Sequence, residues 1–243
     1  MVAVLDFIAL GWFLVCWIGY SEYSRRRAGS RPCLSNTLDL YREDWMRGML
    51  RRENRIADAS VVGNLERNGA FFASSCLLIL AGIITALGYT QEVMEVFSAL
   101  PFGSVPSREI WELRLVVLLL VFVYAFFKFT WSMRLYNFVS VLIGSAPGTD
   151  DGKTSPAARE AFALSAAKVC NQAGDAFNLG LRSYYYALAV VTWFIHPLFC
   201  IAASTWVVYV LYRREFRSVA LEALRAGKVF EEPEKQGRSD KSA

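Results

Sequence analysis

The chain has 243 residues, of which 55% are apolar and 20% are charged, and its formal net charge is +4 at neutral pH. Soluble domains usually contain about 45–50% apolar and about 25% charged residues, so this composition is typical of a protein that contacts lipid. The same figures exclude a disordered chain, a collagen-like repeat and a small disulfide-stabilised domain.

Four segments are long and apolar enough to cross about 30 Å of hydrocarbon, which takes about 20 helical residues. They cover residues 2–20, 69–87, 115–136 and 184–212. None of them alternates like the strands of a membrane barrel, so their backbone groups must be paired within helices. The sequence predicts an all-α integral membrane bundle of four transmembrane helices with cytoplasmic amphipathic helices. It forms one domain over 1–230, followed by a disordered tail over 231–243.

Two other span counts are less favourable. The fourth segment divides at His196-Pro197 into arms of about 14 residues, which are too short to cross at about 1.5 Å per residue. The segment 156–177 carries four charged side chains. Each such charge costs about 2.5–3.5 kcal/mol at the centre of an inserted helix, so this segment is not expected to cross.

The distribution of arginine predicts the orientation. The loop over residues 21–68 holds ten arginines, whereas the loop after the second span is acidic. Because basic loops stay in the cytoplasm, the loop over 21–68 is expected inside and the N-terminus outside. With four spans the tail that begins with Arg213 and Arg214 lies outside, against the same rule. A fifth crossing would remove this disagreement.

Two segments outside the spans have helical spacing. Leu38, Tyr41, Trp45 and Met49 recur at intervals of three and four residues, and arginines and carboxylates fill the other side. This amphipathic helix lies on an anionic leaflet or docks a partner, or it packs on the cytoplasmic ends of the other helices; we favour packing. A second, shorter amphipathic helix is expected over 162–177.

Motifs of common catalysis are absent. The chain has one histidine and five cysteines without CxxC spacing, and it lacks the HExxH, GxSxG and P-loop patterns. Ser165 and Lys168 match the SxxK pattern in only two fixed positions, which arises easily by chance. We therefore expect no catalytic residues, no cofactor and no metal ligands, and we do not expect an enzyme.

Polar side chains at membrane depth are the candidate functional residues. Lys128, Arg134 and Asn137 lie late in the third segment. A cation inside the membrane must face a bundle interior, a water-filled cavity or a carboxylate. The alternative for both cations is that their long side chains reach the interfacial water. Asp6, near the start of the first segment, is expected to be solvated.

His196 and Pro197 lie near the middle of the fourth segment. A proline inside a helix removes one backbone hydrogen bond, so Pro197 is expected to kink this span. His196 beside a kink would be suited to proton relay or gating, or it hydrogen-bonds a neighbouring helix.

Small residues recur at intervals of four in the second segment, at Gly69–Ala73, Ala70–Ser74 and Gly82–Ala86. Such pairs permit close approach of helices, within one chain or between chains.

The chain resembles a family of uncharacterised, mainly bacterial multipass membrane proteins catalogued as a domain of unknown function. The resemblance is carried by ENRIADASVVGNLERNGAFFASSCLLILAG, FFKFTWSMRLYNFVSVLIGSAP and FNLGLRSYYYALAVVTWFIHPLF, followed by LYRREFRS. It covers the chain from the first loop to Ser218. It implies a protein of the bacterial inner membrane and supplies no activity, substrate, cofactor or site residue.

Two functional hypotheses follow. The first is a non-enzymatic accessory or scaffold subunit that assembles through its small-residue helix faces and its cytoplasmic helix. The alternative is an oligomeric channel or transporter for a small solute or ion, lined by Lys128, Arg134 and His196. The expected partners are the lipid bilayer and either further copies of this chain or other membrane proteins, and no nucleic acid.

Overall fold

The computed structural model describes residues 2–28, 33–98, 107–149 and 154–227. Its elements are α1 (Val2–Leu14), the π-helical turn η1 (Val15–Gly19), α2 (Tyr20–Ala28), α3 (Leu34–Leu50), α4 (Ile56–Gly88), α5 (Thr90–Ser98), α6 (Arg108–Ser145), α7 (Pro156–Trp193), α8 (Pro197–Phe216) and α9 (Val219–Gly227). Every regular element in the described ranges is helical, which confirms the predicted all-α fold. The predicted tail over 231–243 lies outside these ranges.

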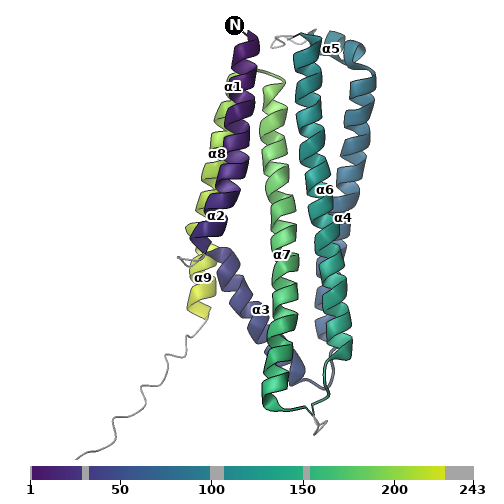
Figure 1. Ribbon diagram of the computed structural model, residues 1–243, viewed down its shortest axis with the longest axis vertical. Helices are drawn as coiled ribbons and strands as arrows, with labels where there is room; N and C mark the ends of the chain where they lie inside the picture. Colours follow the sequence, from purple (N-terminus) through teal and green to yellow (C-terminus); the bar gives the residue numbers. More distant parts are fainter. Residues whose placement is uncertain (1, 29–32, 99–106, 150–153, 228–243) are drawn as a thin grey trace, which may run out of the picture.

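The long helices lie side by side along one axis (Figure 1). α1 continues through η1 into α2 and runs from the N-terminus towards α3, and α6 and α8 run the same way. α4 and α7 run in the opposite direction. Three helices of the described chain are long and apolar enough to cross a membrane: Val4–Arg27, Ile56–Gly88 and Arg108–Ser145. They overlap the first three segments predicted from the sequence.

The prediction of one continuous helix over 184–212 is wrong. α7 ends at Trp193, and His196 has an extended backbone with φ −160° and ψ 142°. The cause is Pro197, which disfavours helical backbone at the residue before it and is itself suited to the first position of a helix. His196 Nδ1 accepts a hydrogen bond from the N–H of Leu198 at 3.2 Å and so caps α8. Pro197 therefore begins a helix and does not kink one.

The turn at Pro197 makes α7 and α8 an antiparallel hairpin (Figure 1). Its arms are longer than expected, with 38 residues in α7 and 20 in α8. α7 is long because it begins at Pro156 and includes the charged segment that we assigned to a separate short helix.

The helix predicted in the first loop is α3, which packs against α7. Its buried residues Met46, Met49 and Leu50 join a core with side chains from α4, α6 and the first half of α7. The Arg42 guanidinium lies against Gly174 of α7, where a built Cβ would be 2.9 Å from its Cζ, so a larger residue there would displace this side chain. Packing on other helices, the favoured alternative, is the arrangement observed for α3.

Aromatic side chains fill the space between α4, α6 and α7. Phe72 stacks on Phe129 with ring centroids 5.2 Å apart, and the ring of Phe177 lies 5.5 Å from that of Phe129. Gly180 leaves room for this cluster, since a Cβ there would lie 2.7 Å from the Phe129 ring.

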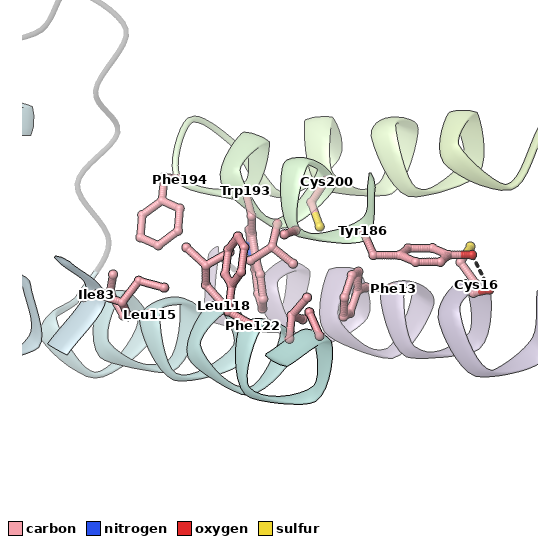
Figure 2. Close-up of a cluster of buried hydrophobic side chains, with 14 of the residues drawn as sticks. Phe13, Cys16, Ile83, Leu115, Leu118, Phe122, Tyr186, Trp193, Phe194 and Cys200 are labelled. Carbon is pink, nitrogen blue, oxygen red and sulfur yellow. Dashed lines mark hydrogen bonds between the residues drawn. The ribbon is translucent and has the colours of Figure 1, made fainter. Parts of the chain in front are cut away.

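A second group of buried side chains joins α1 and η1 to α7 (Figure 2). The hydroxyl of Tyr186 donates to the carbonyl of Cys16 at 3.0 Å, and the Phe13 ring lies 6.0 Å from the Tyr186 ring. α1 and α7 are far apart in the sequence, so these contacts hold the first span against the last helical hairpin.

Candidate functional site

A charged cavity of about 480 Å³ lies where η1, α2, α3, α6, α7 and α8 meet. We call it the charged cavity, and we call the end of the bundle that holds α3 and α9 the basic end (Figure 1). The charged side chains of its wall are Glu22, Arg25, Asp39, Lys128, Asp175, Arg182 and Glu215. The wall thus carries four acidic and three basic groups.

The contact between α4 and α6 shows how far the cavity extends along the apolar part of the bundle. Gly69 of α4 lies beside Met133 of α6, because a Cβ on Gly69 would be 2.7 Å from Met133 Cγ. Gly69 opens the apolar part of α4, directly after Arg67 and Asn68. Lys128 is five residues before Met133, which is about 7.5 Å along the helix axis. The cavity therefore reaches past the level at which the apolar part of α4 begins.

Lys128 contributes a cation without a carboxylate partner. Its Nζ lies 5.3 Å from the centroid of the Tyr124 ring, a cation–π contact. Within the described ranges no carboxylate oxygen lies within 4.0 Å of this nitrogen. Tyr124 is one helical turn closer to the N-terminus of α6, so the lysine side chain points away from the basic end, as side chains in α-helices do.

Arg182 and Glu215 join α7 to α8 in the cavity wall. Their side chains are 17% and 14% exposed, and Arg182 Nη2 lies 3.3 Å from Oε2 of Glu215. Arg182 also donates to Oγ of Ser24 at 3.3 Å, and Glu215 accepts from the N–H of Ser35 at 3.2 Å. This network fixes α2 and α3 on the α7–α8 hairpin.

Asp39 and Asp175 form the acidic part of the wall. Asp175 accepts a hydrogen bond from Oγ of Ser35 at 3.1 Å, and no basic nitrogen of the described chain lies within 4.0 Å of it. Asp39 pairs with Arg42 at 2.9 Å. Burial raises the pKa of Asp39, and the negative charge of Asp175 adds to that increase. The two carboxylates thus repel one another. The charge of Asp39 is neutralised by Arg42, whereas the charge of Asp175 is not neutralised by a basic side chain of the described chain.

The four candidate residues from the sequence do not converge. Lys128 lines the charged cavity. Arg134 and Asn137 are exposed, and the Arg134 guanidinium lies 5.7 Å from the Phe138 ring. His196 lies in the turn between α7 and α8, at the opposite end of the bundle from α3 (Figure 1).

A second polar group lies near the N-terminal end of the bundle. Asp6 is fully buried, so the expectation that it is solvated is wrong. Its Oδ1 accepts from Arg114 Nη2 at 2.6 Å and from Trp193 Nε1 at 2.7 Å. Because Asp6 lies in the first predicted span and Arg114 in the loop just before the third, nothing in the sequence paired the two charges.

The sequence reasoning missed Asp39, Asp175, Arg182 and Glu215. Asp39, Asp175 and Arg182 were expected in two cytoplasmic loops and Glu215 in a tail on the other side of the membrane, so nothing brought the four together. One signal was present, because the uncharged stretch from 183 to 212 is bordered by Arg182 on one side and by Arg213, two residues before Glu215, on the other. Among the described residues no group of three or more histidine, cysteine or acidic side chains is arranged to hold a metal ion.

The comparisons with known proteins give one match. A family model described as "Protein of unknown function, DUF599" matches residues 8–220. Comparison with curated proteins and with solved structures gives no match.

Proposed function

We propose, starting from the membership of this chain in the DUF599 family of unknown function, that it is a non-enzymatic accessory protein of the bacterial inner membrane that binds a small polar ligand. The ligand occupies the charged cavity at the basic end. This proposal keeps the first functional hypothesis and gives it a site.

One observation carries the proposal: the cavity wall holds charges of both signs that other protein groups do not neutralise. Lys128 and Asp175 both lack an ion-pair partner within 4.0 Å in the described part of the chain. Ionisable groups near membrane depth are unfavourable unless they are paired or serve a site. Ion pairs that only hold helices together would not leave these two groups open to a 480 Å³ cavity.

The proposal includes five membrane crossings, with α7 and α8 added to the three apolar helices. From Ala176 to its end α7 carries one charged side chain, Arg182, which faces the charged cavity, and α8 carries none from Pro197 to Tyr212. α8 brings Arg213 and Arg214 to the end of the bundle where α2 carries three arginines (Figure 1). Five crossings therefore satisfy the positive-inside rule, with the N-terminus outside and the basic end inside.

No observation favours the channel alternative. Lys128 lines the charged cavity, whereas Arg134 is exposed on the surface and His196 lies in the turn between α7 and α8. These three residues therefore form no common lining within one chain. The stacked rings of Phe72 and Phe129 occupy the space between α4, α6 and α7.

The test is mass spectrometry of the protein extracted from its own membrane in polymer nanodiscs. We expect one bound species per chain in the wild type and in Arg134→Ala, and a large loss of that species in Lys128→Ala. Arg134 is a matched control because it is an exposed cation on the same helix. A wild-type particle without a bound species, or equal retention by both variants, would overturn the proposal.

A further inference from the structure

We infer that the charged cavity recognises a phosphoethanolamine group, with the phosphate at Lys128 and Arg182 and the primary ammonium at Asp175. This inference rests on the proposed function and names the chemistry of the ligand.

The cavity wall holds one cation and one carboxylate that have no ion-pair partner in the described chain. Lys128 lacks a carboxylate partner and Asp175 lacks a basic partner, so a ligand that satisfies both must carry an anionic and a cationic group. The cavity wall has four acidic and three basic side chains. Because Arg42 neutralises Asp39, the remaining three acidic and three basic side chains balance, which favours a zwitterionic ligand over a purely anionic one.

The charged side chains of the cavity follow one another in a definite order along the bundle axis. α7 runs away from the basic end, and Arg182 follows Asp175 by seven residues, about 10 Å along the helix axis. Side chains point towards the N-terminus of their own helix. Lys128 on α6 therefore points away from the basic end and Asp175 on α7 points towards it. The cations form the layer nearer the membrane centre, and the free carboxylate lies nearer the basic end.

The rim of the cavity includes two exposed apolar residues. Ile18 and Tyr124 line it and are 64% and 38% exposed. Both belong to helices that are apolar enough to cross a membrane, so this rim faces lipid. A phospholipid of the inner leaflet would place its acyl chains along this rim, its phosphate at the cation layer and its ammonium at the carboxylate.

The ammonium is primary and not quaternary. Asp175 and Asn178 in the wall offer side-chain oxygens, which accept hydrogen bonds from N–H groups. A quaternary ammonium has no N–H to donate and is usually bound by aromatic cages. Tyr124 is the one aromatic residue among the described residues of this wall, and its ring is already in contact with Lys128. The wall therefore offers no aromatic cage for a quaternary ammonium.

The experiment uses the delipidated full chain in nanodiscs that hold equal amounts of phosphatidylethanolamine, phosphatidylglycerol and phosphatidylcholine, and measures the bound lipid by native mass spectrometry. We expect phosphatidylethanolamine to be retained over the other two. Lys128→Ala and Asp175→Asn should each lower its occupancy by about tenfold, the size expected for one charge-assisted hydrogen bond. Arg134→Ala and Glu66→Gln, on other surfaces, should leave it unchanged.

Soluble glycerophosphoethanolamine distinguishes the two sources of the group. If it binds the wild type and displaces the lipid, the cavity recognises the free headgroup; if it does not, the lipid is the ligand, and both results support the inference. Retention of phosphatidylglycerol, or of another species that Lys128→Ala loses, would overturn the inference while leaving the proposed function in place. A chain that retains nothing would overturn both.

Discussion

Asp6 and Arg114 form an ion pair that is almost completely buried, although they are 108 residues apart in the chain. Oδ1 of Asp6 lies 2.6 Å from Nη2 of Arg114, and the exposed fractions of the two side chains are 0% and 2%. Trp193 donates to the same oxygen and lies under the guanidinium at 5.6 Å. One carboxylate thus joins α1 to α6 and α7.

Removal of the arginine alone should strongly destabilise the protein. Arg114→Met leaves Asp6 buried without its cation, and loss of one partner of a buried pair costs about 3–5 kcal/mol. The double variant Asp6→Asn/Arg114→Met removes the stranded charge and should recover part of that loss. The measurement is thermal unfolding of the detergent-solubilised protein. Arg108→Met, which breaks an exposed pair with Glu112, is the control and should change little. Equal losses for Arg114→Met and Arg108→Met would contradict the assigned pair.

A methyl group at Gly180 should disrupt the aromatic cluster. Gly180→Ala places Cβ 2.7 Å from the Phe129 ring, and overpacking of this kind costs about 1–3 kcal/mol. The control is Gly82→Ala, where nothing lies within 4 Å of the added carbon and the better helix propensity of alanine should give a small gain. Unfolding temperatures of the two variants check this prediction. A stable Gly180→Ala would mean that α6 and α7 do not approach as described.

The stability of the protein should depend on pH through Asp39. Its pKa in the folded chain is raised above the ordinary value of 3.8 by burial and by the negative charge of Asp175. The folded state then holds this proton more tightly than the unfolded state, so stability from this group is present below pH 3.8 and is lost as pH rises through the folded pKa. Asp39→Asn cannot titrate. The stability of the wild type relative to Asp39→Asn should therefore increase as pH falls from about 7 to about 4. A constant difference in unfolding temperature would show that Asp39 is not desolvated.

The apolar helices were predictable because long uncharged runs permit one secondary structure in lipid. α4 and α6 follow directly from them, and Lys128 followed from its depth. The hairpin was not predictable from hydropathy, because a continuous helix and two antiparallel helices differ only at His196-Pro197. The charge penalty was applied to the whole segment 156–177, whereas these charges lie between Pro156 and Asp175 of a helix that continues to Trp193.

The pairings of the site were beyond the sequence for a different reason. Arg182 meets Glu215 across a turn, and Asp6 meets Arg114 across 108 residues, and no local spacing encodes such contacts. The side chains of the charged cavity come from six elements, so its wall exists only once those elements have packed.

The charged cavity is expected to face the inside of the cell, and cysteine labelling in intact cells tests this placement directly. The five native cysteines are buried, so the wild type supplies a low background. Val219 at the start of α9 and Tyr89 after α4 are 81% and 60% exposed; Tyr89 follows the end of α4 at the top of the view, whereas α9 lies beside the lower half of the bundle (Figure 1). With five crossings, a membrane-impermeant maleimide should label Tyr89→Cys in intact cells and Val219→Cys only after permeabilisation. Labelling of Val219→Cys in intact cells would contradict the account.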